Sequence, residues 1–197
     1  MFEVLYRITE RNEDLVLWNE STFKEGGDIS GFFALNVNGY HHGHYHNYPL
    51  NPNECGLESL TYWFSVLILA FQELCRSGYV AVNDIESHIE WIEFKKSQDM
   101  AEINLIKAEK PNGTTMLKLT PFEHFEYGSW YIQTVKAGEL YGELVERRHE
   151  SVRLSKIRSE LLRKASQYLE EIEEVNPKLI GNKQIMELAS LVMSLQR

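Results

Sequence analysis

A ten-residue apolar run, Tyr62 to Phe71 (YWFSVLILAF), is the feature that most constrains what this chain can fold into. It lies inside a helical pattern from about Cys55 to Ser77, in which apolar side chains occupy most of the helix circumference. A helix of this kind has to be covered on more than one side. The run is also shorter than the ~20 residues that cross a bilayer. We therefore expect a buried core helix over about 55–77 and no membrane span.

Short β-type runs separated by turn residues lie on both sides of this helix. Asn38-Gly39 is the strongest two-residue signal for a β-hairpin, Asn53 is a candidate N-cap and Gly78 a candidate C-cap for the helix. Because strands, a helix, more strands and then helices follow one another in blocks, the order favours an α+β fold with an antiparallel sheet. The expected strands cover 2–8, 15–23, 29–37, 40–48, 79–82, 88–95, 101–108, 114–120 and 125–135.

The C-terminal part has a helical pattern from Gly138 over roughly 37 residues, which Asn176-Pro177 ends. A second helix follows, with apolar residues at Ile185, Leu188, Val192 and Leu195. We predict an acidic α+β domain over 1–138 and a helical hairpin over 139–197, packed on that domain or extending from it. Either the second helix only covers the first, or the overhang of the long helix is a homodimer or partner interface.

The acidic charge is confined to the first part of the chain. Residues 1–138 hold 19 acidic and 10 basic side chains, which account for the whole formal net charge of −9, while 139–197 hold ten of each. An acidic body repels nucleic acid and suits either simple solubility or basic protein partners. A basic stretch over 147–164 has interleaved glutamates and is therefore better explained by salt bridges than by nucleic-acid binding. The charged N-terminus and the two separated cysteines favour a cytoplasmic protein.

The sequence His41-His42-Gly43-His44-Tyr45-His46 is the most conspicuous cluster of side chains that carry chemistry. On a strand, the period of two places His42, His44 and His46 on one face, where imidazoles could bind a divalent metal. The nearest acidic residue, Glu54, is too far along the chain for the spacing of cupin metal sites. A polar hairpin face and a partner-binding surface remain open as alternatives to the metal site.

A second cluster places Asp84, Glu86, His88, Glu90 and Glu93 at the start of an expected strand, as a solvated sheet face or a cation-binding face. No phosphate-binding glycine loop, no Gly-x-Ser-x-Gly elbow and no internal repeat accompanies it, so no catalytic residue is assigned. The residues predicted to bind a partner are Tyr40, His42, His44, Tyr45, His46, Tyr48, Asp84, Glu86 and Glu90.

The hairpin segment Gly31 to Tyr40 (GFFALNVNGY), which precedes the aromatic-rich helix at Tyr62 to Leu74, resembles small bacterial families of unknown function. Some of these families are counted among the immunity proteins of polymorphic toxin systems. The resemblance implies a protein that neutralises a toxin by stoichiometric binding, and many such toxins are basic nucleases that an acidic surface fits.

Our leading hypothesis is a non-enzymatic cytosolic binding protein, an immunity protein or a small defence-system subunit, with no cofactor. It would use the acidic sheet and the 40–48 hairpin as its contact surface. The first alternative is a metal-dependent enzyme centred on His42, His44 and His46. The second is a dimeric scaffold that assembles through 139–197.

Overall fold

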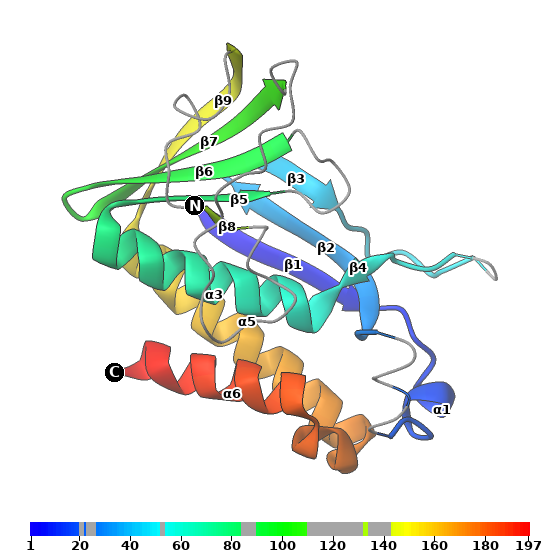
Figure 1. The fold of residues 1–197 in the computed structure, drawn as a ribbon. Helices are drawn as coiled ribbons and strands as arrows, with labels where there is room; N and C mark the ends of the chain where they lie inside the picture. The colour runs from blue at the N-terminus through cyan, green and yellow to red at the C-terminus, as the bar shows by residue number, and fades with distance from the viewer. Residues whose placement is uncertain (20–21, 23–26, 52–53, 84–89, 110–131, 134–142) are drawn as a thin grey trace. The chain divides into compact units, whose positions relative to one another are not determined.

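The fold is described here from a computed structural model, which places all residues except 20–21, 23–26, 52–53, 84–89, 110–131 and 134–142 (Figure 1). It combines antiparallel sheets with helices, which confirms the predicted α+β class. The described chain forms two compact units, a first unit of Met1–Ile68 with Ile157–Arg197 and a second unit of Leu69–Lys156. The predicted division after residue 138 falls outside the described residues, and the units divide at other positions.

The first unit contains a four-stranded antiparallel sheet. Its strands are β1 (Phe2–Ile8), β2 (Ser30–Val37), β3 (Tyr40–His44) and β4 (Glu58–Ser59), with β2 in the middle and β3 and β4 both paired to it. The predicted hairpin at Asn38-Gly39 is confirmed. Both residues have positive φ, 52° and 90°, which is the backbone that a tight two-residue turn between twisted strands requires.

Helix α3 (Leu60–Ser77) begins in the first unit, where its aromatic side chains pack on the sheet. The Trp63 ring stacks on Phe33 with 5.1 Å between centroids, and the Phe64 ring meets Tyr6 at 5.2 Å. Tyr168 reaches the same core from the C-terminal part, with its ring 5.1 Å from that of Phe64. The predicted packing of a sheet on a buried apolar helix is therefore confirmed.

The predicted start of this helix near residue 55 is wrong, because the preceding residues pair with the sheet. Glu58 and Ser59 form β4, and Gly56 passes so close to the Gly31 backbone that a Cβ added there would lie 2.0 Å from the Gly31 carbonyl carbon. The helix is capped from a distant segment instead, since Oδ2 of Asp28 accepts the Tyr62 N–H at 2.8 Å. The predicted cap, Asn53, lies outside the described residues.

The predicted C-terminal helical hairpin is confirmed in its second part only. It consists of α5 (Leu154–Val175), the 3-10 helix η1 (Pro177–Gly181) and α6 (Lys183–Gln196), and it packs on the first sheet through Tyr168. The buried residues of the two helices follow the predicted apolar spacing. They are Ile157, Leu161, Ala165, Tyr168 and Ile172 in α5, and Ile185, Leu188, Val192 and Leu195 in α6.

The helix predicted to begin at Gly138 is wrong over its first part, because Glu143–Arg153 form strand β9. The interleaved Glu and Arg residues suggested helical i,i+4 pairs, yet this segment pairs over its whole length with β7 (Met100–Glu109). Long-range pairing in a sheet overrides local helix preference. Helix α5 begins only where the Leu154 N–H donates to the Asp99 carbonyl, at 2.8 Å.

The second unit is built around a five-stranded antiparallel sheet in the order β8-β5-β6-β7-β9. It adds β5 (Tyr79–Asn83), β6 (Glu90–Ser97) and β8 (Ile132–Gln133) to β7 and β9, with a register shift between Leu105 and Ile106. The strands predicted over 79–82, 88–95 and 101–108 are confirmed in their described parts. The strand predicted over 114–120 lies outside the described residues, as does most of the one over 125–135.

A strand predicted over 15–23 is wrong for the described residues, where a short helix α1 (Asn12–Leu15) and a turn replace it. The carbonyls of Leu15 and Trp18 accept hydrogen bonds from the Asn176 side chain, so these groups need no strand partner.

None of the described helices is long and apolar enough to cross a membrane.

Candidate protein-contact site

The histidine-rich segment runs from the edge of the first sheet into a loop. Strand β3 ends at His44, so His46 lies beyond the strand and the predicted three-histidine strand face does not form. Gly43 breaks the regular geometry, with φ of 90° and no room for a Cβ, which would lie 2.4 Å from the Phe33 carbonyl oxygen. We call residues 45–57 the arm; residues 52 and 53 within it are not described.

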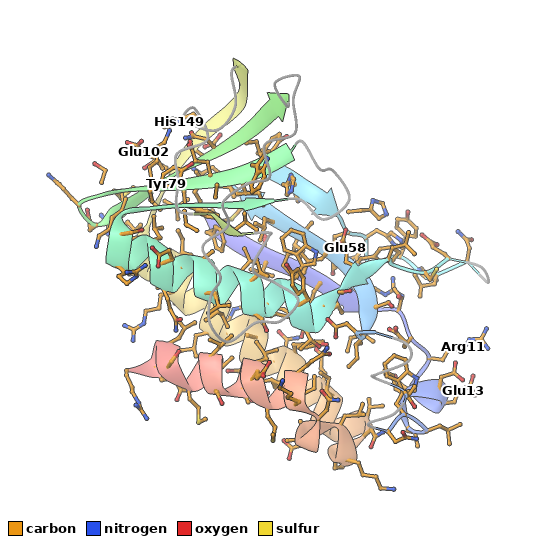
Figure 2. All side chains as sticks on the ribbon, viewed as in Figure 1. Arg11, Glu13, Glu58, Tyr79, Glu102 and His149 are labelled. Carbon is orange, nitrogen blue, oxygen red and sulfur yellow. The ribbon has the colours of Figure 1, made fainter. Side chains whose placement is uncertain are left out.

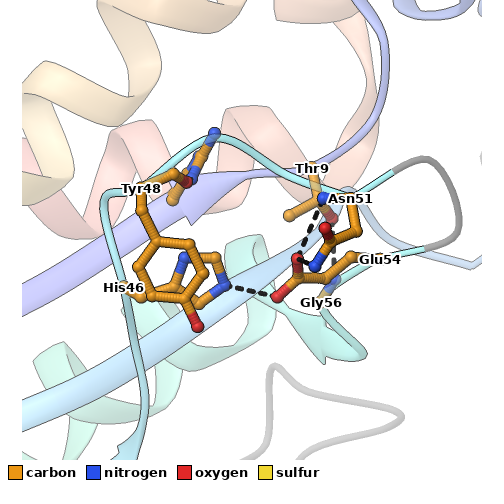
Figure 3. A network of polar contacts seen from close by, with 7 residues as sticks. Thr9, His46, Tyr48, Asn51, Glu54 and Gly56 are labelled. Carbon is orange, nitrogen blue, oxygen red and sulfur yellow. Dashed lines mark hydrogen bonds and ion pairs between the residues drawn. The ribbon is translucent and has the colours of Figure 1, made fainter.

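His46 is buried and packs against aromatic rings, one of which is the Tyr48 ring shown next to it in Figure 3. The Tyr48 ring stacks on it at a centroid distance of 3.7 Å, and Phe32 of β2 lies at 4.6 Å. The exposed ring of His44 is 5.6 Å away. This stack packs the start of the arm against the sheet.

Glu54 closes the arm by binding back to His46. Its Oε1 lies 2.6 Å from Nε2 of His46, while Oε2 accepts the backbone N–H of Asn51 at 3.0 Å and its side-chain amide at 3.1 Å (Figure 3). The Asn51 N–H, and after it the His46 ring, hold the pKa of the Glu54 carboxyl below its ordinary value. The carboxyl is therefore ionised at neutral pH, and His46 is the donor in the pair.

Two contacts fix the arm to β1 and to the residues just after it. The Gly56 N–H donates to Oγ1 of Thr9 at 3.1 Å, and Nη1 of Arg7 donates to the Tyr48 carbonyl at 2.6 Å. These contacts and the His46–Glu54 pair hold both halves of the arm. The arm is thus a loop held by side-chain contacts, even though its described residues form no sheet ladder.

The same geometry leaves apolar and aromatic surface facing solvent. Tyr48 is 54% exposed and Leu57 is 78% exposed. Large apolar side chains held at fixed positions on a surface are the anchors from which protein interfaces gain most of their affinity. The arm therefore has the properties of a protein-contact site.

The structure brings together only some of the residues predicted to bind a partner. His44, His46 and Tyr48 lie in one ring cluster, with Tyr40 and His42 half-buried in β3 and Tyr45 half-buried at the start of the arm. Asp84, Glu86 and the Glu90 side chain lie outside the described residues. Their part in a contact surface stays a prediction.

Two residues that complete the site, Glu54 and Leu57, are not among the predicted site residues. Leu57 falls inside the helix expected over about 55–77, and Glu54 immediately precedes it. The one local signal was the cluster of Pro49, Asn51 and Pro52, which marks a loop between His46 and Glu54.

A metal centre has no complete ligand set in the part of the chain that the structure describes, where no group of three or more His, Cys, Asp or Glu side chains could hold an ion. Nδ1 of His46 is buried without a hydrogen-bond partner there. The metal site at His42, His44 and His46 therefore stays a prediction, and the described residues supply no further ligand for it.

The second unit has a polar network of another kind, on one face of its sheet. The buried carboxylate of Glu93 accepts from Tyr79 Oη at 3.0 Å and from Asn104 Nδ2 at 2.8 Å, and lies 2.6 Å from Nζ of Lys95. Oδ1 of Asn104 then binds Nδ1 of His149 at 2.7 Å. Figure 2 labels Tyr79 and His149 on this sheet. Glu93, Asn104 and His149 are direct cross-strand neighbours, so the strand register assembles the network.

No known family model, curated protein or solved structure matches this chain. The resemblance to bacterial immunity proteins has no relative that could test it and stays a prediction. The function therefore has to be inferred from the geometry of the described residues.

Proposed function

We propose that this chain is a non-enzymatic binding protein that holds a protein partner through the arm and the exposed side of β3. The observation that carries the proposal is the closed arm itself. The His46–Glu54 pair and the Tyr48 stack hold a loop that exposes two large side chains, the apolar Leu57 and the aromatic Tyr48.

A pre-shaped loop is favourable for binding because association otherwise has to order the loop at a cost in conformational entropy. Tyrosine is well suited to such a loop, since it offers a large contact area with only two side-chain torsions. The exposed imidazole of His44, whose ring lies 5.6 Å from that of His46, adds a polar group at the edge of the same surface. The arm thus combines apolar anchors with a polar rim.

The net charge favours a basic partner. A formal charge of −9 and an ionised Glu54 beside the anchors speed the approach of a basic protein and disfavour nucleic acid. A cytoplasmic immunity protein that neutralises a basic toxin is the specific form of the proposal. That form rests on the resemblance of the hairpin and helix at residues 31–74 together with the charge.

The test is capture of a partner from an extract of the organism that encodes the chain. The wild type is compared with Tyr48→Ala/Leu57→Ala and with a matched control, Met186→Ala/Met193→Ala, which removes two similarly exposed apolar side chains from α6. We expect the arm variant to recover at least ~10-fold less of one stoichiometric partner, because hot-spot residues each contribute more than a kcal/mol. The α6 control should recover it fully.

Equal recovery by the arm variant and the wild type would contradict the proposal. Circular dichroism and thermal unfolding of all three proteins show whether a loss comes from unfolding.

The scaffold alternative gains one observation, since α6 exposes Met186 and Met193 seven positions apart on one helix face. The same α6 variant tests it. A dimer by light scattering that becomes a monomer in Met186→Ala/Met193→Ala would establish self-association through the hairpin.

A further inference from the structure

A second exposed apolar element in the first unit is the turn at residues 16–18, which follows α1. Val16 is 56% exposed and Leu17 is 76% exposed. Turns at a protein surface are usually built from polar residues and glycine, because apolar side chains there gain nothing from folding. Two adjacent apolar side chains on a turn therefore need a reason.

The turn is not loose, since one buried side chain of the C-terminal hairpin holds it. Nδ2 of Asn176 donates to the carbonyls of Leu15 at 2.8 Å, Val16 at 3.3 Å and Trp18 at 2.9 Å. Oδ1 of Asn176 accepts the Lys178 N–H at 3.2 Å, which fixes the amide in place at the junction between α5 and η1. These hydrogen bonds hold the backbone that carries Val16 and Leu17.

The turn lies at the end of the first unit from which the arm also extends (Figure 1). Helix α1 follows β1 closely in the chain, and Thr9, just past the end of β1, binds Gly56 in the arm at 3.1 Å. The turn and the arm are thus attached to the same part of the sheet. Both present apolar side chains on a backbone that polar side chains hold.

Acidic groups stand next to both elements. Glu13 and Asp14 are exposed on α1 immediately before the turn, with Nη1 of Arg11 3.9 Å from Oε1 of Glu13. In the arm, the ionised Glu54 binds the His46 ring on which Tyr48 stacks. A partner that accepts Val16 and Leu17 would meet carboxylates at the edge of the contact. Charge complementarity therefore calls for basic side chains around an apolar cleft.

We propose that the 16–18 turn is the second part of the contact surface and inserts into an apolar, basic-rimmed cleft of the partner protein. Asn176 is the positioning residue that holds it. This inference rests on the proposed function, because it names what the partner of the arm has to offer.

Site-specific photo-crosslinking tests the two parts separately. The photoreactive residue p-benzoylphenylalanine replaces Leu17, Leu57 or, as a control, Met193 in the full chain, and each protein is irradiated in extract of the encoding organism. We expect the same partner to be cross-linked from positions 17 and 57 and not from 193. Glu13→Lys/Asp14→Lys should reduce the adduct at position 17 at least fivefold.

Each other outcome is decisive. An adduct at position 57 alone overturns the proposal that the turn contacts the partner and leaves the proposed function standing. No adduct at either position overturns both proposals. An adduct at 17 that ignores the charge reversal overturns the basic rim of the cleft.

Asn176→Ala provides the readout for positioning. It should abolish the adduct at position 17 and spare the adduct at 57. Asn182→Ala, which removes the N-cap of α6 instead, should affect neither. Loss of both adducts in Asn176→Ala would show a general structural role and contradict the positioning role.

Discussion

The two units use polar side chains in opposite ways. In the second unit the sheet comes first, because strand register places Glu93, Asn104 and His149 opposite one another and their hydrogen bonds follow from it. In the first unit, polar contacts hold segments that lie outside the strands. Glu54 holds the arm, and Asn176 holds the 16–18 turn.

This difference bears on where contact surfaces are found. A network that follows from strand pairing stabilises the sheet, while a network that holds a loop leaves the outer side of that loop available. The exposed apolar residues Leu17, Tyr48 and Leu57 all stand on loops held in the second way. Substitutions in the two units should therefore change the free energy of unfolding by unequal amounts.

The largest effect is expected from Glu93→Ala in the second unit. It leaves the donors on Tyr79 and Asn104 without an acceptor, so the free energy of unfolding should fall by about 4 kcal/mol. Glu102 lies on the same face of β7 as Asn104 but is only half-buried. Glu102→Ala is therefore the matched control and should change the free energy of unfolding by less than about 0.5 kcal/mol. Urea denaturation measures both. A loss for Glu93→Ala no greater than the control would show that the network is dispensable.

The next effect concerns Asp28, a buried carboxylate that caps α3 from a loop of the first unit. Burial raises its pKa from 3.8 to about 6, against hydrogen bonds from Thr61 and Tyr62 that lower it. The folded state therefore binds more protons than the unfolded state between these two values, and stability falls as pH rises through this window. The shift corresponds to about 3 kcal/mol.

Asp28→Asn keeps a hydrogen-bond acceptor for the Tyr62 N–H but does not titrate. Between pH 4 and pH 7 the wild type should lose about 2 kcal/mol of unfolding free energy through this group, and the variant should lack that loss. If the free energy of unfolding depended on pH equally in the two proteins, the Asp28 carboxylate would be in contact with water and its pKa would not be raised by burial.

A smaller effect distinguishes two asparagines of the C-terminal hairpin. Asn176→Ala removes hydrogen bonds to three carbonyls and one N–H, although the Leu15 carbonyl keeps the Trp18 N–H, and should cost about 2 kcal/mol because the amide is buried. Asn182→Ala removes an N-cap and should cost about 1 kcal/mol. Thermal unfolding of both variants checks the order. A reversed order would mean that water satisfies the carbonyls of the turn.

What could be predicted from the sequence follows from how local each signal is. The hairpin at Asn38-Gly39, the strands over 79–82 and 101–108 and the apolar seam of α6 depend on neighbouring residues, so their patterns sufficed. Strand β9 was missed because its interleaved Glu and Arg residues also suit the i,i+4 pairs of a helix, and only pairing with β7 decides.

The candidate site was predicted in part for the same reason. The histidines and Tyr48 are conspicuous in the sequence, but the closure of the arm depends on Glu54 returning to His46 across a loop. The start of α3 depends on Gly56 passing the backbone of Gly31, and Asn176 signalled only the end of a helix. Contacts between residues so far apart in the chain leave no local pattern.

The central claim is that the arm is held in one shape before any partner binds, and amide hydrogen exchange by NMR tests it most directly. In the free wild-type protein we predict slow exchange at the Asn51 and Gly56 N–H groups, which donate to Glu54 and Thr9. Glu54→Ala should raise the exchange rate at Asn51 at least tenfold and leave the amides of β2 unchanged. Unprotected exchange at Asn51 and Gly56 in the wild type would contradict the claim, because the arm would then have no fixed shape to offer a partner.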